Sequence, residues 1–345
     1  MLANLKQHKR KYPQRTWQDD VKWLYQAVLG CEHFVSDFKE SYQRIKAECG
    51  QTHWLEAEIL SDDFIRVNFS GLNDIEAMVL NRLFVESAKV SVHSLDTLKT
   101  VLKEYQAGCS RDEQMALETY MQSGCPAVHH SPVYRQAYKP CYRVICRAWW
   151  PYFSLLCQIE ALGKGIVGID GRCGSGKSTT GALLSRLYHC PLIHMDDFYL
   201  PLDMRTAERL SEPGGNVYYE RFDQEVMRPI QNKEHLHYGI FDHRIMDVGT
   251  YRDEAISDLY IVEGSYAFHP TLESYYDLKI FMTIDKDYQR QRILKRNGIE
   301  GWKMFESRWI PLEEHYFSDR DFEKIADYII EVHADQVICR KNSGI

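Results

Sequence analysis

A glycine-rich segment at residues 166–179, with the sequence IVGIDGRCGSGKST, constrains the fold of this 345-residue chain more than any other stretch. An apolar run leads into it, and its Gly171, Gly176, Lys177 and Ser178 fit the phosphate-loop spacing G-x-x-x-x-G-K-(S/T). Glycines let the main chain adopt dihedral angles that bring its N–H groups against phosphate oxygens, and the following helix adds the positive end of its dipole. The motif predicts that the chain binds a nucleoside triphosphate.

The positions in this segment have different expected roles. Lys177 is expected to reach the β- and γ-phosphates, and the Ser178 hydroxyl is expected to ligate Mg²⁺. Cys173 lies beside Arg172 near a helix start, a setting that can lower the pKa of a thiol, which gives the hypothesis that oxidation there blocks nucleotide binding. The expected nucleotide-binding positions are Gly171, Arg172, Cys173, Gly174, Ser175, Gly176, Lys177, Ser178 and Thr179.

From this segment onward, strand-like apolar runs alternate with helical patterns. The alternation predicts an α/β fold with a parallel sheet flanked by helices, as in phosphate-loop nucleoside triphosphatases. An amphipathic helix at 148–163 precedes the first strand, so we place this domain at 148–345. Strands are expected at 166–170, 191–195, 237–242, 258–263 and 277–284, and helices at 177–188, at about 217–228 ended by Pro229, and from about 286.

Residues 1–147 are expected to form a separate N-terminal α+β domain, to which the sequence assigns no role. Residues 1–150 carry 19 Lys and Arg against 18 Asp and Glu, a balance that disfavours a nucleic-acid partner. Helices are expected at 17–29 with Gly30 ending it, at about 35–49, at 77–90 and at 95–106, and one or two strands within 54–69.

The composition also predicts the cellular setting. No apolar stretch is long enough to span a membrane and the N-terminus lacks the apolar segment of a signal peptide, so we expect a cytoplasmic protein without a membrane partner. The 10 cysteines are scattered without a C-x-x-C pair, which predicts reduced thiols.

A loop at residues 123–140 gathers histidine, aromatic and basic side chains, including His129, His130 and Tyr134. We interpret this cluster as an interface that docks the first domain on the second. A ligand or phosphate site is the alternative, whereas a metal site lacks a third ligand at suitable spacing.

Two apolar runs of the C-terminal domain end in acidic residues. Asp196 and Asp197 close one run, and Glu263 closes another. Because the carboxyl ends of parallel strands meet at one sheet edge, we expect these acids beside the phosphate loop. A carboxylate there can accept the proton of an attacking hydroxyl or help to bind magnesium, the role expected of Glu263. The alternative for the aspartate pair is that it caps the next turn.

Several motifs together resemble the uridine kinase and phosphoribulokinase family of small-molecule kinases. The resemblance implies ATP- and Mg²⁺-dependent transfer of the γ-phosphoryl group to a hydroxyl of a small molecule, with the 5′-hydroxyl of uridine or cytidine as the expected acceptor. It covers about residues 160–335 and is carried by IDGRCGSGKST, by DDFY at 196–199, by GGNVYYERF at 214–222, by IVEGSYAFHP at 261–270 and by YYDLKIFMTID at 275–285.

The resemblance also implies roles for single residues. It makes Asp196 the proton acceptor and matches Glu263 to the family's acidic strand residue. Arg292, with Lys295 and Arg296 on the same helical face, corresponds to the basic lid that stabilises charge on the transferring group. Ile293 is expected to point elsewhere.

The acceptor pocket is expected to use Asp197, Tyr199, Arg221, Phe241, His243 and Arg244. The spacing around these residues departs from that of uridine–cytidine kinases, and Arg244 could equally bind a phosphate of the acceptor. A kinase of a phosphorylated metabolite or of nucleic acid is therefore an alternative, as is a nucleotide-gated binding protein without turnover. A homo-oligomer is compatible with all of these.

Overall fold

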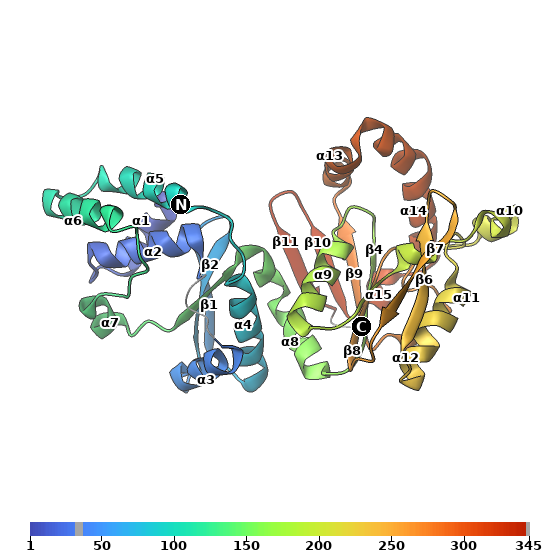
Figure 1. The fold of residues 1–345 in the computed structure, drawn as a ribbon, viewed down its shortest axis with the longest axis horizontal. Coiled ribbons are helices and arrows are strands. Elements are labelled where there is room, and N and C mark those ends of the chain that lie inside the picture. Colours follow the sequence, from blue (N-terminus) through green and yellow to red (C-terminus); the bar gives the residue numbers. More distant parts are fainter. Residues whose placement is uncertain (32–36, 343–345) are drawn as a thin grey trace. The chain divides into compact units, whose positions relative to one another are not determined.

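A computed structural model describes residues 1–31 and 37–342 of the chain (Figure 1). The contacts divide it into two compact units, Met1–Phe153 and Ser154–Ile345. Within the described residues, no helix is both long and apolar enough to cross a membrane.

The C-terminal unit is built on a six-stranded sheet with the strand order β11-β10-β9-β4-β8-β5. Strands β4, β5, β8, β9 and β10 pair in parallel with one another, and β11 pairs antiparallel with β10 at one edge of the sheet. The expected α/β fold with a mainly parallel sheet is confirmed. The strands are β4 (Gly165–Gly171), β5 (Leu192–His194), β8 (Leu259–Glu263), β9 (Leu278–Ile284), β10 (Tyr328–Val332) and β11 (Val337–Lys341).

The central strand β4 positions the glycine-rich segment. Its residues Ile166, Val167 and Ile169 are buried, as a strand flanked on both sides in a parallel sheet requires. The strand leads through the loop into α9 (Lys177–Tyr188), which contacts β4, β5 and β8. The loop therefore lies at the carboxyl edge of the sheet.

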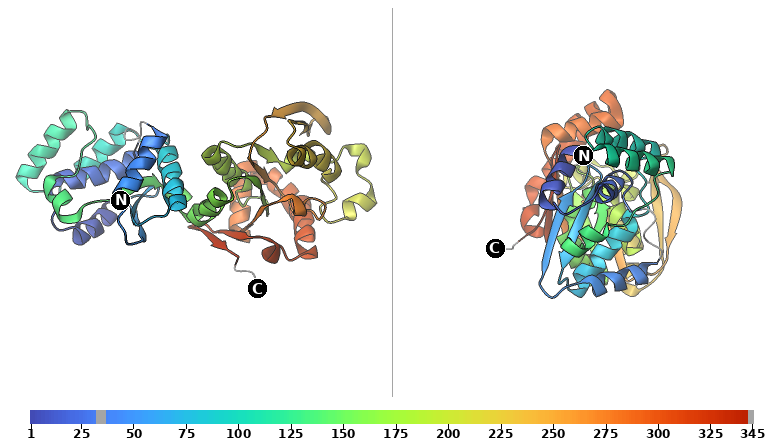
Figure 2. Two further views of the ribbon diagram at one scale, coloured as in Figure 1. Left: turned by 90° about the horizontal axis from the view of Figure 1, so that it is seen from below. Right: turned by 90° about the vertical axis from the view of Figure 1, so that its left-hand side faces the viewer.

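Further helices complete this unit, and the short α10 (Ala207–Ser211) projects from it in both Figure 1 and Figure 2. In α13 (Lys286–Met304) the backbone of Gly298 has a φ of 69°, which marks a kink between two helical segments. The remaining helices are α8 (Phe153–Leu162), α11 (Tyr219–Phe222), α12 (Arg228–Asn232), α13 (Lys286–Met304), α14 (Ile310–Asp319) and α15 (Phe322–Ile325).

Two local expectations in this unit are wrong. The strand β6 (Leu236–Asp242) is not part of the main sheet but pairs antiparallel with β7 (Asp247–Glu254), a strand too polar and exposed to be recognised by its apolar pattern. The helix before it does not end at Pro229, because Pro229 lies in the first turn of α12 after a π-helical turn at Asp223–Met227. The altered hydrogen bonding of a π-turn accommodates a residue that lacks an N–H.

The N-terminal unit has the expected α+β composition, with an antiparallel sheet in the order β1-β2-β3. The predicted end of α2 at Gly30 is confirmed by its φ of 68°, whereas the first two residues of the helix expected from about 35 lie outside the described part of the chain. Its elements are α1 (Leu2–Lys11), α2 (Trp17–Leu29), α3 (Phe38–Glu48), β1 (Trp54–Ile59), β2 (Phe64–Ser70), α4 (Asp74–Ser87), α5 (Leu95–Gln106), α6 (Arg111–Gln122), α7 (Pro132–Tyr138) and β3 (Tyr142–Cys146).

The histidine and tyrosine cluster is an interior feature of the N-terminal unit. Nδ1 of His130 lies 2.9 Å from a carboxylate oxygen of Asp19, and Nε2 lies 2.7 Å from the Tyr142 hydroxyl oxygen. The His130 ring stacks on the Tyr134 ring, with 4.2 Å between the centroids. Burial lowers the pKa of His130 to about 4, so the imidazole is neutral at pH 7. His130 and Tyr134 are buried, and His130 contacts Asp19, Tyr142 and Tyr134 of the same unit. The interpretation of the loop as a docking interface stays a prediction.

Candidate active site

The glycine-rich loop depends on backbone conformations that other residues rarely adopt. Gly171, Gly174 and Gly176 have φ values of 141°, 77° and 103°. A Cβ on Gly171 would lie 1.9 Å from the carbonyl oxygen of Met282 on the neighbouring strand. Glycine at this position therefore permits both the turn and the close approach of two strands.

The loop forms one wall of a cavity of about 930 Å³ at the carboxyl edge of the sheet. Side chains from the ends of β5 and β8, from α13 and from α14 line the other walls. The predicted site residues that line it are Cys173, Gly174, Gly176, Lys177, Ser178, Thr179, Asp196, Tyr199, His243, Glu263, Arg292, Lys295 and Arg296.

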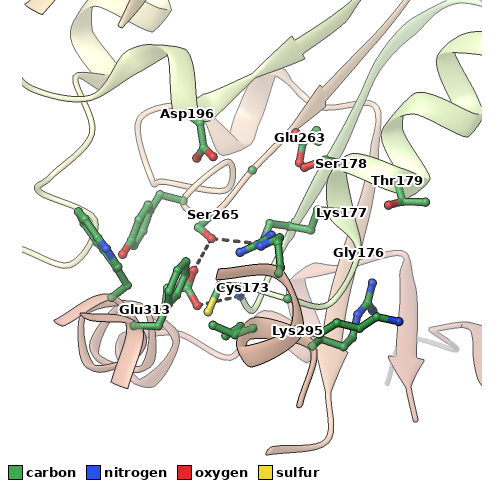
Figure 3. Close-up of a pocket in the computed structure, with 18 of the residues that line it drawn as sticks. Cys173, Gly176, Lys177, Ser178, Thr179, Asp196, Glu263, Ser265, Lys295 and Glu313 are labelled. Carbon is green, nitrogen blue, oxygen red and sulfur yellow. Dashed lines mark hydrogen bonds between the residues drawn. The ribbon is translucent and has the colours of Figure 1, made fainter. Parts of the chain in front are cut away.

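Lys177 points along the loop at the centre of this cavity (Figure 3). Its ammonium group donates to the carbonyl oxygens of Gly171 at 2.5 Å and Arg172 at 3.2 Å, and to the Ser265 hydroxyl at 3.2 Å. This position keeps a positive charge beside the start of α9, whose dipole has the same sign at that end. The wall is suited to a polyanion.

Ser178 and Glu263 lie near each other on the side of the cavity formed by α9 and β8 (Figure 3). Glu263 is buried and its carboxylate lies 2.5 Å from Nδ1 of His194, the residue opposite it in the β5–β8 register. This hydrogen bond raises the pKa of His194. Hydroxyl and carboxylate oxygens are ligands that suit Mg²⁺, which keeps several waters in its shell, so the two residues fit this ion.

Asp196 lies just after β5 and also lines the cavity, in the upper part of Figure 3 together with Glu263 and Ser178. Its Oδ1 accepts a hydrogen bond of 3.2 Å from the Tyr199 hydroxyl. The rings of Tyr199, His243 and Trp309 stand close together there, with 5.4 Å between the Tyr199 and His243 centroids and 6.1 Å between those of Tyr199 and Trp309. A carboxylate beside aromatic faces is suited to a hydroxyl compound with a flat or apolar portion.

Three predicted loop residues do not line the cavity, namely Gly171, Arg172 and Ser175. The guanidinium group of Arg172 binds both carboxylate oxygens of Glu314, at 2.6 and 3.0 Å, and its N–H donates to Met282. The Ser175 side chain is buried, and its N–H donates to the Arg172 carbonyl. Both residues shape the loop without lining the cavity, and their assignment to nucleotide binding stays a prediction.

Four predicted acceptor residues also lie outside the cavity lining, namely Asp197, Arg221, Phe241 and Arg244. Arg221 donates to the carbonyl oxygens of Asp197 and Gly239, so it connects two segments behind the pocket. The pKa of the Asp197 carboxyl is raised by burial. The side chain of Arg244 is 89% exposed and paired with Asp242, and its role as a substrate ligand stays a prediction.

Phe241, also expected in the pocket, packs against two of the side chains that line the cavity. Its ring packs against those of Tyr199 and His243, with centroid distances of 5.9 and 5.1 Å. Contact with these two lining residues orients the aromatic wall without placing Phe241 in the cavity lining.

The prediction of a low thiol pKa at Cys173 is wrong. Burial, followed by the charge of Glu313, raises the pKa of this thiol. The Gln289 side chain also donates to the Cys173 carbonyl oxygen at 2.8 Å. A thiol in this setting stays protonated near pH 7, since the neighbouring carboxylate disfavours the thiolate.

The basic cluster of α13 lines the cavity as expected, with Arg292 3.4 Å from the Ser175 carbonyl oxygen. Ile293 departs from its expected orientation. It is buried and lies near Gly174, where it supports the loop. The cations and this apolar contact therefore share one side of the helix.

Sequence reasoning missed several lining residues, among them Ser265, Tyr266, Trp309 and Glu313. Ser265 and Tyr266 follow Glu263 and Gly264 directly, so their place after a strand end was a usable signal. No local pattern marks Trp309 and Glu313, which reach the cavity because α14 folds back onto the loop.

No family model matches the chain, and no curated protein matches it. A solved structure described as a possible uridine kinase from Bacillus stearothermophilus is 19% identical, covers 48% of this chain and 88% of its own, and gives a TM-score of 0.37. Phosphoribulokinase from Rhodobacter spheroides is 14% identical over 49% of this chain and 70% of its own, with a TM-score of 0.36. A gluconokinase from Sinorhizobium meliloti is 14% identical over 50% of this chain and 84% of its own, with a TM-score of 0.29. Likenesses this distant identify no activity, which has to be inferred from the site itself.

Proposed function

We propose that this protein is a kinase that transfers the γ-phosphoryl group of ATP to a hydroxyl of a small molecule, with the 5′-hydroxyl of a nucleoside as the favoured acceptor. The observation that supports this most is that Asp196 lines the same cavity as Lys177, Ser178 and Glu263. A protein that only binds nucleotide has no need of a carboxylate facing the phosphate loop.

The donor half of the reaction is assigned to the loop and its neighbours. Lys177 and the loop N–H groups hold the phosphates, while Ser178 and Glu263 hold Mg²⁺, which neutralises phosphate charge when bound. Arg292, with Lys295 and Arg296, stabilises the negative charge that spreads over the transferring group. We propose residues 148–345 as the domain that carries this activity.

The acceptor half is assigned to the wall around Asp196. Asp196 accepts the proton of the attacking hydroxyl, and the hydrogen bond from Tyr199 orients its carboxylate. The rings of Tyr199, His243 and Trp309 offer stacking surfaces for a nucleoside base. Since the protein supplies no covalent chemistry, positioning and charge stabilisation account for the rate.

ADP release with Mg²⁺ and ATP, measured against nucleosides, nucleoside monophosphates and sugar phosphates, tests this proposal. We expect Asp196→Asn to slow turnover by about 10²–10⁴-fold while ATP binding stays nearly intact. Asp203→Asn, on an exposed residue of the turn Leu202–Met204, is the matched control and should leave both unchanged. Full activity of Asp196→Asn would contradict the assignment of the base, and ATP binding without turnover on any acceptor would favour a nucleotide-gated binding protein.

A further inference from the structure

Glu313, on the cavity-facing side of α14, binds directly to the phosphate loop (Figure 3). One carboxylate oxygen accepts the N–H of Cys173 at 2.8 Å, and the other accepts the Ser265 hydroxyl at 2.6 Å. The residue is only 5% exposed. The Glu313 carboxylate therefore occupies the Cys173 N–H, a main-chain donor of the loop that is proposed to bind phosphates.

The surroundings of this carboxylate are those of an anion site. The Ser265 hydroxyl that it binds also accepts from the Lys177 ammonium group at 3.2 Å. The N–H groups of Arg172 and Ser175 are bonded to main-chain carbonyls, whereas that of Cys173 is directed to Glu313. Since one N–H cannot serve two anions at full strength, a phosphate oxygen at this donor and the Glu313 carboxylate exclude each other.

The contact also ties the loop to one particular helix. Glu314, the next residue, binds Arg172 through both of its oxygens, outside the cavity lining. Trp309 lies one helical turn before Glu313 and lines the cavity beside Tyr199. Glu313 and Trp309 lie on one continuous helical segment, so a shift of α14 that separates Glu313 from Cys173 also displaces Trp309.

We propose that Glu313 makes the site discriminate between nucleoside triphosphates and diphosphates. The γ-phosphoryl group displaces the Glu313 carboxylate from the Cys173 N–H, and this displacement moves Trp309 at the acceptor wall. A diphosphate does not reach this donor and leaves the contact in place. This inference rests on the proposed binding of ATP.

Calorimetric titration of the full chain with Mg²⁺-ATP and with Mg²⁺-ADP tests the proposal. Glu313→Gln keeps the shape of the side chain and removes its charge, so we expect ATP affinity to rise about tenfold to hundredfold because charge repulsion is lost. ADP affinity should change less than about threefold. Glu306→Gln is the matched control, since it removes a charge from an exposed residue outside the cavity lining, in the helical turn before α14, and should leave the ratio of the two affinities unchanged.

Tryptophan fluorescence gives a second measurement that needs no change at Glu313. ATP should alter the emission of the unmodified chain and ADP should not, and the ATP signal should be absent in Trp309→Phe. Thermal unfolding followed by circular dichroism shows whether Glu313→Gln folds. The fluorescence measurement tests the proposal even if that variant does not fold.

Three outcomes would overturn the inference: lower ATP affinity in Glu313→Gln, equal shifts for ATP and ADP, or the same Trp309 signal with both nucleotides. These outcomes leave the proposed function intact as long as the unmodified chain binds ATP and Lys177→Ala abolishes that binding. Absence of ATP binding in the unmodified chain overturns the proposed function and the inference together.

Discussion

Replacing Gly171 by alanine should damage the centre of the proposed donor site. Its φ of 141° lies in a region that is almost restricted to glycine, and forcing another residue there costs about 1–3 kcal/mol. The new methyl group would also lie 1.9 Å from the Met282 carbonyl oxygen. Relieving such an overlap in a packed interior costs about 1–3 kcal/mol more, because β4 and β9 must separate.

Gly163→Ala is the matched control for this change. Gly163 also has a positive φ, 68°, but nothing lies within 4 Å of its added Cβ, so its cost is limited to the backbone, about 1 kcal/mol. We therefore expect Gly171→Ala to lower the free energy of unfolding by about 2–6 kcal/mol, well beyond the control. Urea unfolding followed by circular dichroism measures both, and equal losses in the two variants would refute the steric reasoning.

Two further predictions concern titration. His130 has its pKa lowered to about 4 from an ordinary 6.5, so its contribution to stability is complete above pH 6.5 and is lost as the pH falls towards 4, by up to about 3 kcal/mol. Unfolding of the unmodified chain and His130→Asn across pH 4–8 checks this, and parallel curves would contradict it. Since burial raises the pKa of the Cys173 thiol, iodoacetamide at pH 7.5 should alkylate it at least about tenfold more slowly than free cysteine. Mass spectrometry measures that rate, and rapid labelling would contradict the protonated thiol.

The parts of the fold that were predictable are those with a strong local signal. The apolar run Ile166–Ile169, the glycine spacing and Lys177 suffice for the β4–loop–α9 unit, because each constraint acts within a few residues. The strand β7 was missed because its exposed residues, such as Tyr251, show no apolar alternation. Pro229 was read as a helix end because a π-turn has no sequence signature of its own.

The residues of the candidate site likewise separate into those that a local pattern predicts and those that depend on distant contacts. Asp196 and Glu263 could be placed at the sheet edge from strand ends alone, since parallel strands share a direction. The side chain of Arg172 could not be placed, because its partner Glu314 is distant in sequence and turns it away from the cavity. The contact of Glu313 with the loop was unpredictable for the same reason.

The strand order gives the two halves of the cavity unequal mechanical support. Lys177 follows β4, which is held by a strand on each side, whereas Asp196 follows β5, a strand of three residues at the sheet edge with β8 as its neighbour. Short edge strands open more readily than central ones. If the proposed kinase function holds, substitutions around Asp196 change the range of acceptors while the loop at Lys177 keeps its geometry.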